Sequence, residues 1–132
     1  MGPASDLLSE FRTAGRTLFS FGLVRETEGN LSMSDGHHLV ITRTGSSLTE
    51  LGSGDVLEGT LDQPPAGSSA DLAIHLATYR ARGPGAVVHT HPPGTVPEGQ
   101  PPGADHGSYV HAPTLADAVA EQVRRVRDGG AP

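Results

Sequence analysis

The chain has 132 residues, a length typical of one domain, and its formal net charge is −6. Its nine basic residues are all arginine and it has no cysteine, which excludes disulfides, zinc ribbons, thiol nucleophiles and lysine Schiff bases. No segment resembles a signal peptide or a membrane span, and no basic cluster suits nucleic acid. We therefore expect a cytoplasmic domain without nucleic-acid or membrane partners.

The first half of the chain has the apolar spacing of one helix followed by short strands. Residues 5–21 carry apolar side chains three and four positions apart, which predicts an amphipathic helix. Asp35-Gly36 is a hairpin signal between two strand-like segments. The predicted strands lie within residues 28–34, at 38–42 and near 56–58.

The second half predicts a helix, a buried strand and a final helix. Gly67-Ser68-Ser69 opens a helix over 70–81, and the apolar run 86–91 that follows predicts a strand. Proline and glycine dominate residues 92–107, which we expect to form a loop. The last helix is predicted over 114–127, with residues 128–132 as a frayed tail.

The most informative motif is His89-Thr90-His91 at the end of the buried strand. Side chains alternate along a strand, so His89 and His91 emerge on one face about 7 Å apart at the backbone. Two imidazoles at that spacing can bind one metal ion. Paired histidines also occur on solvated strand faces, so the motif alone leaves both interpretations open.

Three further segments offer hydrogen-bond donors suited to an anion. Gly29-Asn30-Leu31-Ser32 and Thr42–Gly45 combine backbone amides with short polar side chains, although each also fits an ordinary turn. Ser68 and Ser69 lie at a predicted helix N-terminus, where free amides attract phosphate. Ser68-x-x-Asp71 fits a capping box equally well.

Taken in order, these motifs and the segments 79–80 and 86–91 resemble the class II aldolase/adducin family over residues 8–91. That family includes metal-dependent sugar-phosphate aldolases, a pentulose-phosphate 4-epimerase, a thiosugar-phosphate dehydratase and the non-enzymatic adducin head. The resemblance implies one domain over residues 1–132. Its fold would be a reduced three-layer α/β/α sandwich with a mostly antiparallel central sheet, in a homo-oligomer with active sites at subunit interfaces.

The resemblance also implies roles for individual residues. Asp71 stands where most members carry the catalytic acid–base glutamate, and His89 and His91 match two ligands of a divalent metal ion, which we expect to be zinc. The ion would stabilise an enediolate. The predicted substrate-binding residues are Gly29, Asn30, Ser32, Thr44, Gly45, Ser68 and Ser69.

Two features depart from the family pattern. Ala70 replaces a usual serine, and the late strand that carries the third metal-binding histidine is absent, because residues 110–127 resemble the helix that precedes it. His106 or His111 is a candidate replacement ligand, and Tyr109 is a candidate proton donor. We expect His75 to pack near the core rather than bind metal.

The first functional hypothesis is a metal-dependent lyase, or a related isomerase, acting on a small hydroxy-carbonyl compound such as a sugar phosphate. A second hypothesis is a non-catalytic binding or assembly domain with the same fold, which the missing late histidine favours. A third is metal-free acid–base chemistry in the same pocket, with the histidines as proton carriers.

Overall fold

The computed structural model describes residues 5–25, 27–91 and 108–129. Three α-helices and five strands account for most of this part of the chain, with a single 3₁₀ turn, η1 (Ser53–Asp55), before the third strand. The helices are α1 (Ser5–Ser20), α2 (Leu72–Arg82) and α3 (Leu115–Gly129). The strands are β1 (Asn30–Ser34), β2 (His38–Thr42), β3 (Val56–Thr60), β4 (Gly85–Thr90) and β5 (Ser108–Ala112).

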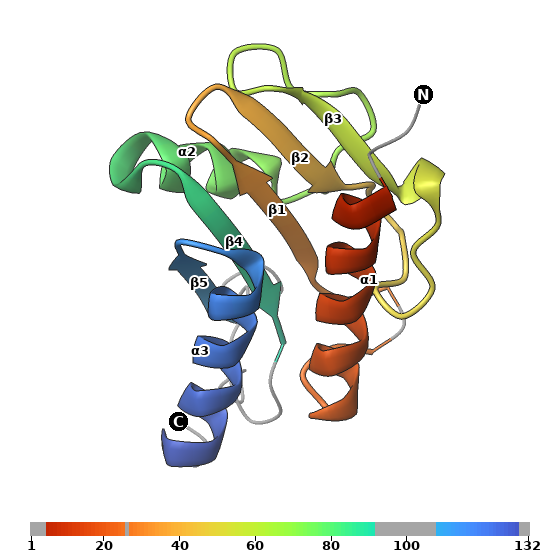
Figure 1. Cartoon of the computed structure of the whole chain (residues 1–132), viewed down its shortest axis with the longest axis vertical. Coiled ribbons are helices and arrows are strands. Elements are labelled where there is room, and N and C mark those ends of the chain that lie inside the picture. The colour runs from red at the N-terminus through yellow and green to blue at the C-terminus, as the bar shows by residue number, and fades with distance from the viewer. Residues whose placement is uncertain (1–4, 26, 92–107, 130–132) are drawn as a thin grey trace, which may run out of the picture.

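The five strands form one sheet in the order β3-β2-β1-β4-β5, and every neighbouring pair is antiparallel. β1 therefore lies at the centre of the sheet, between its hairpin partner β2 and the later strand β4 (Figure 1). Asn30 of β1 pairs with His89 of β4, and His89 pairs in turn with Tyr109 of β5. This register places polar residues from three strands side by side.

Helices cover both faces of the sheet. On one face, α1 and α3 lie side by side and pack against the sheet through the larger core, which includes Leu31, Val88 and Val110 (Figure 1). On the other face, α2 packs over a smaller cluster that contains Ile41 and Val87. Because side chains alternate along each strand, the same strands supply both cores. The structure confirms the predicted three-layer α/β/α sandwich with an antiparallel sheet.

The sequence did not predict β5. Its residues overlap the segment 110–127 that we assigned by resemblance to a helix, whereas α3 begins only at Leu115. β5 forms because it pairs with β4 over its full length and buries Val110 in the larger core. The last helix also extends to Gly129, into the predicted tail. The predicted loop 92–107 lies outside the described residues.

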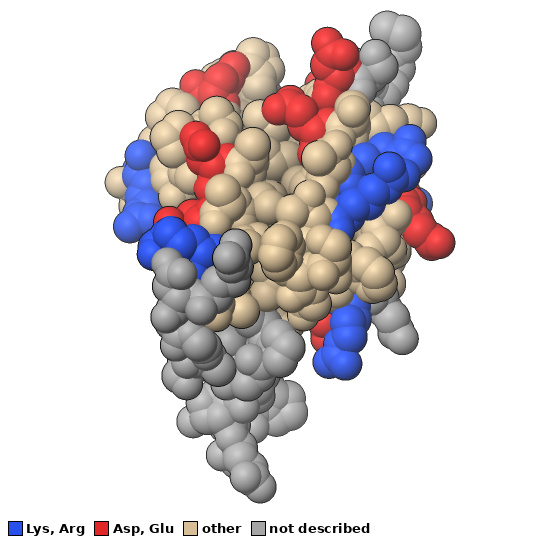
Figure 2. Space-filling model, turned by 60° about the horizontal axis from the view of Figure 1, so that its bottom comes forward, with Lys and Arg blue, Asp and Glu red and all other residues tan. Residues whose placement is uncertain are grey.

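The surface carries charges of both signs. On the face that Figure 2 shows, acidic and basic side chains of the described residues alternate in small groups around an uncharged centre. Among the described residues, the helices are too short or too polar to cross a membrane.

Candidate active site

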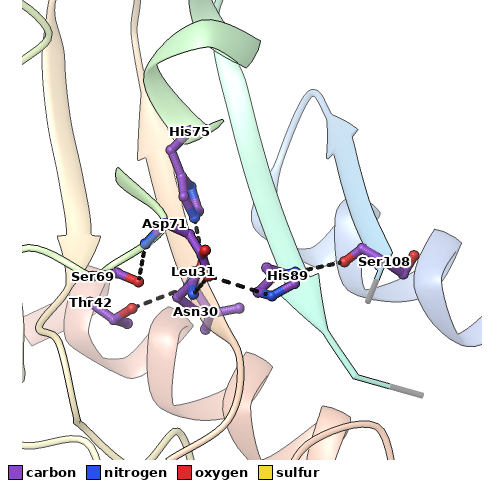
Figure 3. Close-up of polar contacts among 8 residues, drawn as sticks. All are labelled: Asn30, Leu31, Thr42, Ser69, Asp71, His75, His89 and Ser108. Carbon is purple, nitrogen blue, oxygen red and sulfur yellow. Dashed lines mark hydrogen bonds and ion pairs between the residues drawn. The ribbon is translucent and has the colours of Figure 1, made fainter. Parts of the chain in front are cut away.

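Polar side chains gather on the α2 side of the sheet, where α2 begins and where β1 and β4 lie next to each other (Figure 3). Asn30 is the first residue of β1, His89 is the fifth residue of β4, and Asp71 immediately precedes α2. Three elements from different parts of the chain thus supply neighbouring side chains. We describe this group as the candidate active site.

Gly29 shapes the entry into this site. Its φ is +81°, a backbone conformation that residues with a Cβ rarely adopt. A Cβ built on Gly29 would lie only 2.8 Å from the carbonyl oxygen of His89, so the backbone of β4 approaches too closely for any side chain. The backbone amide of Leu31, two residues after Gly29, donates to Thr42 Oγ1 at 3.2 Å. These contacts fix where Asn30 emerges.

Asp71 directs its carboxylate toward β1 and β4. Its Oδ2 accepts a hydrogen bond from Asn30 Nδ2 at 2.8 Å and lies 3.5 Å from His89 Nε2. The carboxylate makes no capping bond to α2. The alternative interpretation of Ser68-x-x-Asp71 as a capping box is therefore wrong. Ser68 Oγ donates to the carbonyl oxygen of Pro65 instead, at 2.5 Å, while Ser69 Oγ accepts from the Asp71 amide at 3.3 Å.

The two histidines of the His-x-His motif lie together, as the strand spacing predicts. The ring centroids of His89 and His91 are 4.7 Å apart. His89 is buried and its Nδ1 lies 3.2 Å from the carbonyl oxygen of Ser108, whereas His91 is half-buried. When Nδ1 donates its proton to Ser108, Nε2 is the nitrogen of His89 that can bind a metal ion.

Tyr109 lies directly against His89. Its ring stacks on His89 with centroids 4.0 Å apart and an angle of 14° between the planes. The phenolic oxygen is buried and lies close to the Asp71 carboxylate. Burial, and then the negative charge of Asp71, raise the pKa of the Tyr109 phenol above its usual value. The phenol therefore keeps its proton at neutral pH.

A buried polar network lies behind Asp71, and the sequence did not predict it. His75 contacts Asn30 Oδ1 through Nε2 and Ser32 Oγ through Nδ1, the second at 2.6 Å. Ser32 Oγ also lies 2.7 Å from the hydroxyl of Tyr79. Burial, and secondarily the nearby His89, lower the pKa of His75 to about 4. His75 is fully buried, in agreement with our expectation that it packs near the core.

The loops that the sequence assigned to anion binding lie next to each other. The amide of Thr44 donates to Gly67 O at 2.8 Å, and the amide of Ser69 donates to Thr42 O at 3.1 Å. Thr44 and Gly45 are exposed, and Gly45 has a φ of +75°. Because Ser69 is only two residues from Asp71, these contacts tie the Thr42–Gly45 turn to the candidate site.

Two grooves among the described residues differ in their relation to this site. The larger groove, of about 720 Å³, runs between α1 and α3 on the opposite face from Asp71. A groove of about 470 Å³ lies between α2 and β5, and Tyr109 and His111 line part of it. Of these two grooves, the second is on the face that carries the candidate site.

Comparison with known proteins identifies the family. The profile of the Class II Aldolase and Adducin N-terminal domain matches residues 9–97. The chain belongs to this family. A methylthioribulose-1-phosphate dehydratase from Marinobacter nauticus is 39% identical over a region that covers 59% of this chain and 40% of that protein.

Solved structures of class II aldolases resemble the domain in three dimensions. The L-fuculose-1-phosphate aldolase of Thermus thermophilus superimposes with a TM-score of 0.63 at 36% identity, over 70% of this chain and 48% of that one. The L-fuculose 1-phosphate aldolase of Glaciozyma antarctica gives the same TM-score at 19% identity, over 96% of this chain and 75% of that chain, and supports the fold alone. The chain spans less than half the length of the Marinobacter and Thermus relatives.

The candidate active site contains His89 and His91, the two histidines predicted to bind a metal ion. The structure does not bring His111 to them. Its Nε2 donates to the carbonyl oxygen of Gly83 at 3.1 Å, beyond the far end of α2. His106 lies outside the described residues. Within residues 5–25, 27–91 and 108–129, no three His, Cys, Asp or Glu side chains are grouped to hold a metal.

Proposed function

We propose that this domain is the catalytic part of a lyase that acts on a small sugar phosphate. The observation that carries the proposal is the Asp71 carboxylate, which forms no helix cap and lies 3.5 Å from His89 Nε2. Two relatives, a methylthioribulose-1-phosphate dehydratase and an L-fuculose-1-phosphate aldolase, are named for sugar 1-phosphates, which supports this substrate class.

In this proposal Asp71 is the general base. A carboxylate that faces the substrate can accept a proton from the carbon next to a carbonyl group, the step that begins dehydration and aldol addition. In aldol cleavage, the reverse of addition, the same group returns a proton to that carbon. The bond from Asn30 Nδ2 holds one carboxylate oxygen in place. Tyr109 is the proton donor, because its phenol stays protonated and its buried oxygen lies close to the Asp71 carboxylate.

We propose that His89 and His91 hold a divalent metal ion, with zinc as the first choice. The adjacent imidazoles and the Nδ1 contact of His89 with Ser108 O fit the usual chemistry of such ligands. When bound, the ion would supply Lewis-acid polarisation of a substrate carbonyl. His106 stays a prediction for a further ligand.

The loops around the site are the proposed binding surface for the rest of the substrate. Gly29 approaches it from just before β1, Thr44 and Gly45 from the neighbouring turn, and Ser69 from the loop before α2. Asn30 and Ser32 were also predicted to bind substrate, but both are buried in the polar network, so we assign them a supporting role. The hydroxyl of Ser68 is bound to Pro65 O, so we assign this residue a structural role within the loop.

The domain is also proposed to self-associate. The outer edge of β5 pairs with no other strand of the described residues, and an open strand edge of this kind can pair with another subunit.

The first experiment measures metal content per subunit in protein purified without added metal or chelator. The double variant His89→Ala/His91→Ala is compared with His37→Ala/His38→Ala, a matched pair of exposed histidines at the β1–β2 hairpin. About one divalent ion in the wild type and the hairpin variant, lost in the first variant, is the expected result. No ion bound even after titration with zinc would eliminate the metal site.

A second experiment addresses turnover. Cleavage and dehydration of phosphorylated ketoses are measured for the wild type and for Asp71→Asn. We expect kcat to be about 10²–10⁴-fold lower in Asp71→Asn than in the wild type. Among the described residues no third side chain is grouped with His89 and His91 to hold a metal, which favours one competing function, a binding domain without catalysis. Substrate binding by isothermal titration without any turnover would support that second candidate.

A further inference from the structure

We propose that His75 is a positioning residue that fixes the orientation of the Asn30 side-chain amide and, through it, the Asp71 carboxylate. This inference deepens the proposed function, because it concerns how the general base is held. The side chain of His75 contacts that of Asn30 (Figure 3). Its other side-chain hydrogen bond goes to Ser32, and neither of the two goes to Asp71. Its effect on Asp71 is therefore indirect.

Asp71 lies at one end of the chain of hydrogen bonds, and its carboxylate determines which group donates in each of them. A carboxylate only accepts, so the Asn30 group 2.8 Å from Asp71 must be its NH₂. Asn30 Oδ1 then faces His75 and only accepts, which requires a proton on His75 Nε2. A neutral imidazole has one N–H, so Nδ1 accepts from the hydroxyl of Ser32, whose oxygen in turn accepts from Tyr79.

Reversing this chain would be costly because water cannot replace the lost partners. Ser32 and His75 are fully buried, and Asn30 is 5% exposed. A flipped Asn30 amide would turn its carbonyl oxygen toward the carboxylate and its NH₂ toward the protonated Nε2 of His75. Both contacts would then pair like with like, acceptor with acceptor and donor with donor. The buried imidazole therefore selects one of the two amide orientations.

The sequence spacing shows that the hydrogen-bonded chain joins one side of α2 to one side of β1. Asp71, His75 and Tyr79 are four residues apart, so they lie along one side of α2 and the residue that precedes it. Asn30 and Ser32 are two residues apart and point to the same side of β1. The low pKa of His75 agrees with this arrangement, since the ring stays neutral and keeps a single N–H.

The test begins with the wild-type protein and needs no substrate. Nitrogen-15 NMR of the side chains reports which nitrogen of His75 carries the proton and how the Asn30 NH₂ group is bonded. We expect the proton on Nε2 and an Asn30 NH₂ signal with one strongly shifted, slowly exchanging proton. A proton on Nδ1 of His75 would overturn the proposal, whatever the variants do.

Two variants then separate positioning from packing. In His75→Gln the side-chain amide reaches the place of Nε2 and can still donate to Asn30, whereas in His75→Asn it reaches only the place of Nδ1 and can bond Ser32. We expect the shifted Asn30 signal to persist in His75→Gln and to disappear in His75→Asn. An unchanged Asn30 signal in a folded His75→Asn variant would contradict the assignment.

Kinetics complete the test and distinguish this proposal from the proposed function. We expect kcat to fall about 10- to 100-fold in His75→Asn with KM little changed, a loss typical of groups that orient a ligand or base. His75→Gln should recover most of the lost kcat. Equal losses of kcat in both variants would refute positioning. A wild type without turnover but with the expected NMR signals would refute the proposed function and leave the positioning role intact.

Discussion

Replacing Gly29 with alanine should destabilise the domain more than the same change at Gly45, although the two backbones are alike. The φ angles are +81° at Gly29 and +75° at Gly45. In this left-handed region a Cβ costs about 1–2 kcal/mol at either position. Alanine also lowers the entropy of the unfolded chain, by a similar amount in both variants. These two contributions cancel when the variants are compared with each other.

The difference between the two positions comes from space. A Cβ on Gly29 would lie 2.8 Å from His89 O and 2.8 Å from Cγ1 of Val24, whereas a Cβ on Gly45 meets no atom of the described residues within 4 Å. Overpacking of this kind costs about 1–3 kcal/mol. For a domain of this size, Gly29→Ala should therefore melt about 4–12 °C below Gly45→Ala.

Thermal unfolding of the wild type and both variants, followed by far-ultraviolet circular dichroism, measures this difference. Gly45→Ala serves as the control for the backbone conformation itself. Equal melting temperatures for the two variants would show that β4 does not approach Gly29 as closely as the structure indicates. The register that places Asn30 opposite His89 would then be in doubt as well.

Three further predictions concern the polar network. Ser32→Ala should lower the free energy of unfolding by about 1–3 kcal/mol in denaturant titrations, because it deprives His75 and Tyr79 of their shared partner. The control Ser34→Ala removes only one acceptor for a hairpin amide and should lower the free energy of unfolding by less. Folding lowers the pKa of His75 from 6.5 to about 4, so the stability that the neutral ring contributes is complete above pH 6.5. That contribution, about 3 kcal/mol, should be lost as the pH falls from 6.5 to 4. The free energy of unfolding should therefore fall more steeply with decreasing pH in the wild type than in His75→Gln. Parallel plots of unfolding free energy against pH for the two proteins would contradict this prediction. Asp71→Asn should reduce kcat by about 10²–10⁴-fold without lowering the melting temperature appreciably, since the carboxylate caps no helix; a large loss of stability would show that Asp71 acts structurally.

Local patterns in the sequence predicted most of the helices and strands, and the resemblance to the family implied their three-layer arrangement. Helical spacing located α1 and α3, and the hairpin signal at Asp35-Gly36 located β1 and β2, because these elements bury side chains with a regular period. β5 was missed because one buried residue in five, Val110, gives no such period. Its strand conformation depends on pairing with β4, which is a tertiary contact.

The candidate site was predictable only in part, for a similar reason. The spacing of His89 and His91 predicted that their side chains share one face, since the alternation of a strand is local. The local pattern at Asp71 equally suggested a cap. Its actual partner Asn30 is 41 residues away, and the partner of His75, Ser32, is 43 residues away. No local pattern encodes contacts at that separation.

The larger core on the opposite face of the sheet nevertheless determines the geometry of this site. Leu31 is fully buried against α1 and α3, between Asn30 and Ser32, which point the other way. A slip of β1 by one residue would turn both polar side chains into the larger core and expose Leu31 to the network under α2. The apolar packing of Leu31 therefore excludes the slipped register. The same register keeps Asn30 opposite His89, so packing on one side of the sheet specifies the polar contacts on the other.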